Sequence, residues 1–231
     1  MISALSIVVP CLNEAAAIAS TLARLQPVRQ RGVEVVVVDG GSSDDTPGLA
    51  APFADRVVTA IRGRASQMNA GAAAARGSVL LFLHADCRLP ADAERLIIGG
   101  LAAGGRRWGR FDVAFEGHNP CMRVVAFMMN HRSRLTGIAT GDQGIFIERD
   151  LFLAHGGFPV IPLMEDIALC GRLKANPLLC LPDRIMTSAR RWEQRGILRT
   201  IWLMWRLRFA YYFGADPAKL ASRYDSVRQR N

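Results

Sequence analysis

The chain of 231 residues contains only five cysteines and two lysines, and several common motifs are missing. The cysteines are odd in number and scattered, and none forms a C-x-x-C pair, which argues against a disulfide framework and a thiolate zinc site. No G-x-G-x-x-G follows a predicted strand, which disfavours a dehydrogenase, and no turn continues into the G-K-S/T of a P-loop. The start of the chain lacks the features of a secretory signal, so we expect a cytoplasmic protein.

Positive charge is concentrated in one part of the sequence. The net charge is +9, and arginine outnumbers lysine 27 to 2. Residues 184–231 contain eleven basic and three acidic residues, whereas the rest of the chain is almost neutral. No nucleic-acid recognition motif or aromatic stacking platform accompanies this charge, so we expect no nucleic-acid partner.

Apolar runs alternate with helical segments in the first half of the chain. Strands are predicted at 5–9, 33–38, 56–61 and 78–83, and helices at 13–26 and 65–76. This alternation predicts an α/β fold with a mostly parallel sheet and helices on both faces. Ligands bind such sheets beyond the carboxyl ends of the strands, where Asn13, Asp39 and Asp86 stand. Asn13 is also expected to cap the first helix.

The second half of the chain has a different pattern. Strands are predicted at 109–116 and 144–148, and helices at 119–134, after 164–166 and from 196 onward. No repeat, low-complexity segment or linker interrupts the chain. We therefore predict one domain at 1–195 and a C-terminal amphipathic helical extension at 196–231.

Two polar segments at strand ends allow more than one interpretation. The turn DGGSSDDT (39–46) has glycines that let a ligand approach the backbone, and a tight capped turn without a ligand is the alternative. The segment LHADCRLP (83–90) places His84 and Asp86 directly after a buried strand. These two residues are either part of a metal site or only the end of that strand.

Six motifs in a fixed order carry a resemblance to a known family. They are VVPCLNE (8–14), VVDGGSSDDT (37–46), GRASQMNAG (63–71), LHADCRLP (83–90), TGDQGIFI (140–147) and MED (164–166). Together they resemble the family-2 glycosyltransferases, which have the GT-A fold, a Rossmann-like architecture, and use nucleotide-diphosphate sugars. The resemblance spans residues 5 to 196. It is strongest to the short single-domain bacterial members, among them arsenosugar-biosynthesis-type glycosyltransferases.

The resemblance implies a binding site for a UDP- or GDP-linked sugar. Asp39 would accept a hydrogen bond from the base, and Arg64 would lie near the base and diphosphate. For Arg64 a solvated helix start remains an alternative, and Asn69 could simply permit close helix packing. The implied nucleotide-sugar-binding residues are Pro10, Asn13, Glu14, Asp39, Gly41, Arg64, Gln67, Asn69, Ala85 and Asp86.

The resemblance also implies a divalent cation, Mn²⁺ or Mg²⁺. The usual family pattern is Asp-x-Asp, in which the last carboxylate contacts the cation, and here His84 replaces the first Asp. Mg²⁺ commonly takes one or two protein carboxylates, so Asp86 alone is enough in principle. His84 could be a second ligand, which would favour Mn²⁺. It could instead donate a hydrogen bond to a phosphate or ribose, or be an ordinary strand-end residue.

Catalytic and acceptor-binding residues follow from the same likeness. An inverting transfer needs a base for the acceptor hydroxyl, which the resemblance assigns to Asp166, with Glu165 supporting it. Acidic residues at a helix start also stabilise the helix dipole, which is the structural alternative. Residues expected to face the acceptor or the diphosphate are Asp142, Gln143, Arg190, Arg191 and Trp192, although the last three could form an ordinary basic surface.

The resemblance implies a metal-assisted, inverting glycosyltransferase. A nucleotidyltransferase of similar architecture is the second enzymatic hypothesis, and product analysis would separate the two. A protein that binds sugar nucleotides without turnover is the non-enzymatic hypothesis, and the release of nucleoside diphosphate would exclude it.

The C-terminal segment 195–213 is too short and too interrupted by arginine to span a membrane. On a helix, Arg195, Arg199 and Arg206 fall within about 40° of one another. Such a helix could lie at the inner face of the membrane, with a lipid-linked acceptor, or pack on the catalytic domain or another subunit. Its aromatic residues in neighbouring directions are Trp202, Trp205, Phe209 and Tyr212.

Overall fold

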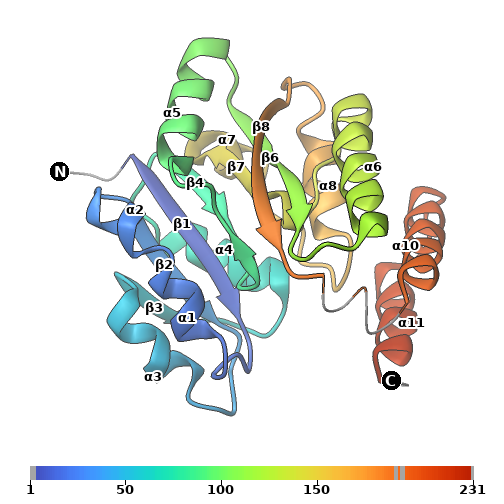
Figure 1. Cartoon of the computed structure of the whole chain (residues 1–231), viewed down its shortest axis with the longest axis horizontal. Helices are drawn as coiled ribbons and strands as arrows, with labels where there is room; N and C mark the ends of the chain where they lie inside the picture. The colour runs from blue at the N-terminus through green and yellow to red at the C-terminus, as the bar shows by residue number, and fades with distance from the viewer. Residues whose placement is uncertain (1–3, 190–191, 193–195, 230–231) are drawn as a thin grey trace.

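The computed structural model describes residues 4–189, 192 and 196–229. Within this part, one sheet contains eight strands in the order β3-β2-β1-β4-β7-β6-β8-β5. The strands are β1 (Leu5–Cys11), β2 (Glu34–Asp39), β3 (Arg56–Thr59), β4 (Val79–Phe82), β5 (Cys87–Arg88), β6 (Trp108–Phe115), β7 (Ile145–Glu148) and β8 (Leu179–Thr187). Figure 1 shows helices on both sides of this sheet.

The four strands β3, β2, β1 and β4 form a parallel half-sheet, as the sequence predicts. Val8 pairs with Val36 on one side and with Phe82 on the other. Along β1 the side chains alternate between two apolar clusters, with Ile7 and Val9 in one and Val8 in the other. Burial on both faces explains why these strands are continuous apolar runs.

The other half of the sheet is mixed. β7 runs antiparallel to both β4 and β6, whereas β8 is parallel to β6 and antiparallel to β5. β8 was not predicted from the sequence because Pro182, Asp183 and Arg184 interrupt its apolar pattern. The strand accommodates them through a register shift opposite Phe111 and Asp112.

The helices are α1 (Ile18–Ala23), α2 (Gln26–Gln30), α3 (Thr46–Ala50), α4 (Arg64–Ala74), α5 (Ala93–Gly104), α6 (Pro120–Thr136), α7 (Arg149–Ala154), α8 (Glu165–Arg172), α10 (Ile197–Tyr212) and α11 (Pro217–Gln229). The expectation that Asn13 caps the first helix is wrong. α1 begins at Ile18, and Asn13 has a φ of 54° because its side-chain oxygen accepts a hydrogen bond from the N–H of Ser43, at 2.8 Å.

The two C-terminal helices pack on the domain near α6 and α8 (Figure 1). Ile197 and Ile201 of α10 pack against the buried face of α6. Leu207 of α10 and Leu220 of α11 form an apolar cluster with Met164, which directly precedes α8. One side of α10 therefore packs against α6 and the start of α8. No helix in the described part is long and apolar enough to cross a membrane.

Candidate active site

The carboxyl ends of β1 and β2 carry two loops that are joined by hydrogen bonds. Asp39 is buried and accepts from the backbone N–H groups of Gly41 and Ser42, both at 2.9 Å. The N–H of Asn13 donates to Ser42 Oγ at 2.9 Å, and the N–H of Ser43 donates to Asn13. Gly41 adopts a φ of 83°, which favours glycine. The turn at 39–46 and the loop after β1 thus form one hydrogen-bonded wall.

Three further residues with an implied nucleotide role lie at these strand ends. Pro10 is half-buried in β1. The N–H of Glu14 donates to Thr46 Oγ1 at 2.8 Å, which joins the same two loops. The carbonyl of Ala85 accepts from Thr21 Oγ1 at 2.8 Å, so the segment after β4 is held against α1.

Two amide side chains implied near the base and diphosphate bind protein backbone. Gln67 is buried, and its Nε2 donates to the carbonyls of Cys11 (2.7 Å) and Val38 (3.0 Å). Asn69 exchanges two hydrogen bonds with the backbone of Phe158, at 2.8 and 2.9 Å. These contacts give both residues a positioning role, Gln67 at the strand ends and Asn69 at the segment that precedes α8.

A candidate cation site lies just beyond β4. Ligand atoms of His84, Asp86 and Cys87 all lie within 4.8 Å of one another, and Asp86 is exposed. A single exposed carboxylate suits Mg²⁺ or Mn²⁺, because these ions take their remaining oxygens from water and substrate phosphates. The residues present therefore fit a divalent cation, with Asp86 as the oxygen ligand.

His84 also joins the end of β4 to the loop before β7. Its Nδ1 lies 3.2 Å from Asp142 Oδ1. Its Nε2 is shielded from solvent and has no hydrogen-bond partner within the described residues. A Cβ at position 141 would lie 2.3 Å from this Nε2, so Gly141 leaves the space that the imidazole occupies. The replacement of the usual aspartate by His84 is thus matched by a glycine opposite it.

The pair Glu165 and Asp166 begins α8 after a residue in a strained conformation. Met164 has a φ of 71° and is buried against Leu207 and Leu220 of the C-terminal helices. A left-handed conformation at a non-glycine residue persists only when its surroundings hold it, and such residues cluster at functional sites. The C-terminal helices therefore help to position the two carboxylates.

The two carboxylates have different partners, as their separation of about 100° on a helix predicts. Glu165 is buried, and its Oε1 lies 3.5 Å from Arg64 Nη1. Asp166 Oδ2 accepts from the N–H of Gly141 at 3.2 Å, and its Oδ1 accepts from the N–H of Ile167 at 2.8 Å. Asp166 is thereby fixed against the loop that carries Asp142.

Burial raises the pKa of Glu165, and the neighbouring Asp166 raises it further, although Arg64 lowers it. Burial lowers the pKa of Arg64, but Glu165, Asp166 and Asp142 raise it more, so its net shift is upward. The arginine therefore stays charged beside this carboxyl pair. Glu165 binds its proton more strongly in the folded chain than in the unfolded chain.

This shift predicts that Glu165→Gln is more stable than the wild type at neutral pH. The pKa of Glu165 is higher in the folded chain than in the unfolded chain. The wild-type protein therefore loses stability as the pH rises from the unfolded-state pKa through the folded-state pKa. The variant lacks this loss, since glutamine does not ionise. Each unit of pKa difference corresponds to about 1.4 kcal/mol, and 1 kcal/mol moves Tm by about 2–4 °C in a chain of this size.

The measurement is thermal unfolding of both proteins between pH 4 and pH 8. The difference in Tm should grow with pH and vanish at the acid end, where Glu165 is protonated in both the folded and the unfolded state. A lower Tm for Glu165→Gln at pH 8 would mean that the ion pair with Arg64 outweighs burial.

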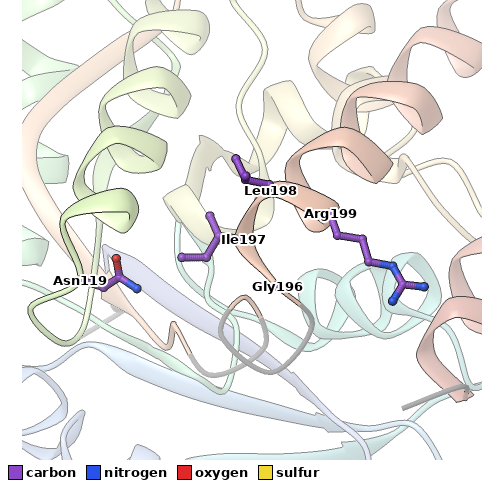
Figure 2. Close-up of a pocket in the computed structure, with 5 residues that line it drawn as sticks. All are labelled: Asn119, Gly196, Ile197, Leu198 and Arg199. Carbon is purple, nitrogen blue, oxygen red and sulfur yellow. The ribbon is translucent and has the colours of Figure 1, made fainter.

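Cavities occur both at this site and away from it. One of about 10 Å³, room for about one water, is lined by Arg64, Met68, Phe82, His84, Gly141, Ile145, Phe158, Glu165 and Asp166. A hollow of about 500 Å³ lies between the starts of α6 and α10. Figure 2 shows Ile197 pointing toward Asn119 there and Arg199 pointing away. We assign the site to the small cavity, because the candidate catalytic carboxyls line it and none lines the larger hollow.

The implied acceptor residues differ in their surroundings. Asp142 is partly exposed beside His84. Gln143 is fully buried, and its side chain hydrogen-bonds Thr140 N–H at 3.2 Å in a capping box, so it holds the loop. Trp192 packs edge to face on Phe115, with ring centroids 5.8 Å apart. Arg190 and Arg191 lie outside the described residues.

Two arginines that sequence reasoning did not assign to the site approach it from α6 and α10. Burial lowers the pKa values of Arg132 and Arg208, and the charge of the nearby Asp166 opposes this shift in part for both guanidinium groups. The sequence gives no signal that separates these two from its other arginines, because the convergence of α6 and α10 at α8 is a tertiary feature.

Comparisons with known proteins identify the family of the chain. The model of the family "Glycosyl transferase family 2" matches residues 6–155. The chain therefore belongs to glycosyl transferase family 2. Uncharacterized glycosyltransferases of Mycobacterium bovis and Mycobacterium tuberculosis are 34% identical to it over 96 residues. That match covers 41% of this chain and 42% of each relative. The likeness to the arsenosugar branch stays a prediction.

Solved structures share the fold. The S. aureus protein TarS (residues 1–349), in complex with UDP-GlcNAc, has a TM-score of 0.64 and 16% identity, over 80% of this chain and 58% of that one. The mannosyltransferase PcManGT from Pyrobaculum calidifontis, in complex with GDP-Man and Mn²⁺, has a TM-score of 0.64 and 21% identity. This match covers 97% of this chain and 69% of that one. These likenesses identify the fold as GT-A and confirm the predicted fold class.

Proposed function

We propose that this protein transfers a sugar from a nucleotide-diphosphate sugar to an acceptor hydroxyl, with inversion at the anomeric carbon. The observation that carries this proposal is the convergence of Arg64, His84, Glu165 and Asp166 on one small cavity beyond the carboxyl ends of the sheet. Ligands of open α/β sheets bind at that edge. Membership of glycosyl transferase family 2 supports the reaction class.

The donor is proposed to lie along the wall formed by the loops after β1 and β2. Asp39 Oδ2 accepts two hydrogen bonds, whereas Oδ1 accepts only from Ser42 Oγ, so Oδ1 can accept a further hydrogen bond from an N–H of the base. Structural neighbours in complex with UDP-GlcNAc and with GDP-Man support a nucleotide sugar. The residues proposed to line the wall are Pro10, Asn13, Glu14, Asp39 and Gly41.

We propose that Asp86, with His84 beside it, holds a divalent cation. Neighbours whose complexes contain Mn²⁺ support this assignment. When bound, such a cation neutralises negative charge on the leaving diphosphate. The protein supplies the carboxylate of Asp86 just beyond β4, and the contact with Asp142 holds the His84 ring in place.

Asp166 is proposed as the base. Its carboxylate takes the proton of the acceptor hydroxyl while the oxygen forms a bond to the anomeric carbon. The bond from that carbon to the diphosphate breaks, and its electron pair leaves with the nucleoside diphosphate. The hydrogen bonds from Gly141 and Ile167 hold the carboxylate in one orientation without protonating it.

A screen of nucleotide sugars by thermal shift, with Mn²⁺ or Mg²⁺, tests the donor assignment. A ligand that binds only the folded chain raises Tm by mass action. The sugar nucleotide that binds is then incubated with candidate acceptors. Release of nucleoside diphosphate supports sugar transfer, release of sugar 1-phosphate would favour a nucleotidyltransferase, and binding without turnover would contradict an enzyme.

We also propose that the outer side of α10 contacts an anionic membrane surface. Trp202 and Trp205 are 63% and 61% exposed, and Phe209 and Tyr212 continue this exposed stripe. Arg206 lies over the Trp202 ring at 5.4 Å, beside the stripe. Aromatic rings at headgroup depth with flanking arginines are typical of interfacial helices. Each basic residue at an anionic surface adds about 1 kcal/mol.

The double variant Trp202→Gln, Trp205→Gln should lose most binding to anionic vesicles, which co-sedimentation measures. Wild-type binding should weaken from low to physiological salt and be weak on neutral vesicles. Ile61→Gln, which alters an 82% exposed residue elsewhere, is the control and should bind normally. If wild-type protein does not pellet with anionic vesicles at low salt, the membrane proposal is wrong. Point variants are preferable to removing 196–231, because α10 and α11 pack on Met164.

A further inference from the structure

Two partly buried arginines near the proposed base have shielded N–H donors without partners. Atoms Nε and Nη2 of Arg132 and Nε of Arg208 are shielded from solvent and bind nothing in the described part of the chain. Neither arginine has an ion pair within 4.0 Å among those residues. Because buried donors in folded proteins are nearly always hydrogen-bonded, three such atoms in one place call for an explanation.

A third arginine, Arg110 of β6, packs against α6 and shows what a purely structural guanidinium looks like here. Arg110 is completely buried, and its side chain donates to Ser133 Oγ (2.9 Å) and to the carbonyl of Asn130 (3.0 Å) and pairs with Asp112. Its charge and its donors are therefore satisfied by the protein. Arg132, two residues from Asn130, lacks such partners.

The two arginines also repel each other. Burial and the neighbouring Arg208 lower the pKa of Arg132 to about 10, so Arg132 remains charged at neutral pH. Arg208 is charged as well, because arginine side chains are not deprotonated in proteins. Two like charges held close together and partly shielded from water destabilise the folded chain unless an anion lies between them. A phosphate group has the charge and the oxygen geometry that guanidinium groups bind best.

The position of the pair relates this anion to the acceptor. The negative charge of Asp166 is close enough to affect the pKa of both arginines, and that of Asp142 affects the pKa of Arg208. Both carboxylates are proposed to face the acceptor. The donor diphosphate is proposed at Asp86, at the end of β4. Resting on the proposed function, we infer that Arg132 and Arg208 bind a phosphate group of the acceptor, beside the hydroxyl that Asp166 deprotonates.

Titration calorimetry with inorganic phosphate, on the full chain saturated with UDP or GDP and Mg²⁺, tests this inference. The nucleotide fills the donor site, so phosphate that still binds occupies another site. Arg208→Gln and Arg132→Gln should each weaken phosphate binding at least tenfold. Arg123→Gln, on the exposed side of α6, is the matched control and should stay within twofold.

Thermal unfolding without phosphate separates a binding role from a structural one. Removing an unpaired buried charge should leave Tm unchanged or raise it in Arg132→Gln and Arg208→Gln. A lower Tm combined with normal phosphate affinity would make these arginines structural and overturn the inference. Wild-type protein that binds no phosphate, or that binds acetate equally well, would overturn it too.

Two further measurements fix the source of the phosphate and keep the proposals separable. A soluble sugar monophosphate and an isoprenyl monophosphate in vesicles are compared as probes. Tighter binding of the first indicates a soluble phosphorylated acceptor, and tighter binding of the second indicates a lipid-linked one. UDP and GDP binding is measured on its own, and phosphate is titrated without nucleotide as well. Failure of both nucleotides to bind would count against the proposed function alone, whereas loss of phosphate binding alone would count against this inference.

Discussion

Asp166→Asn should keep the fold and the affinity for nucleotide sugar while transfer falls about a hundredfold or more, as expected when a general base is removed. Asparagine has nearly the same shape as aspartate, and its single side-chain oxygen can still accept from the N–H group of either Gly141 or Ile167. It cannot take the proton of the acceptor hydroxyl. Rates of product formation, with donor affinity from calorimetry, give the two quantities separately.

Asp150→Asn, on the exposed side of α7, is a matched control for this experiment. It makes the same chemical change away from the site and should leave transfer unaltered. If folded Asp166→Asn protein transfers sugar at nearly the wild-type rate, another group is the base. Glu165 would then be the next candidate, because it adjoins Asp166 and lines the same cavity.

Asp86→Ala should abolish the dependence of nucleotide binding on a divalent cation. One carboxylate supplies the protein's oxygen ligand in the proposed site, so its removal leaves no hard ligand there. Calorimetric titration of UDP or GDP, with and without Mn²⁺, measures this coupling. Wild-type protein should bind much more tightly with the ion, and the variant should bind equally in both conditions.

Two other variants complete this test. Asp92→Ala changes an exposed carboxylate before α5 and should preserve the coupling. His84→Asp restores the usual family pattern and should preserve or tighten cation binding. Metal-coupled binding that survives in Asp86→Ala would remove this residue from the site. A loss of activity in His84→Asp would give the imidazole a specific role, which its contacts with Asp142 and Gly141 make testable.

The sequence by itself determined the family, the parallel half-sheet and where the candidate carboxylates fall. The strands β1, β2 and β4 are buried on both faces and therefore read as continuous apolar runs. The polar residues that follow them, Asp39 and Asp86, necessarily lie at one edge, because parallel strands end on the same side. Local patterning thus carries enough information for this half of the fold.

Only the tertiary structure decided the second half of the sheet and the surroundings of the proposed base. β8 was missed because its burial depends on a register shift against β6 and not on its own pattern. Asn13 left its expected capping position because Ser43, thirty residues away, binds its side chain. The joining of Met164 to α10 and the approach of Arg132 to Arg208 require distant segments to pack together. Long-range packing leaves no periodic signal in a sequence, so these features emerge only when the chain is folded.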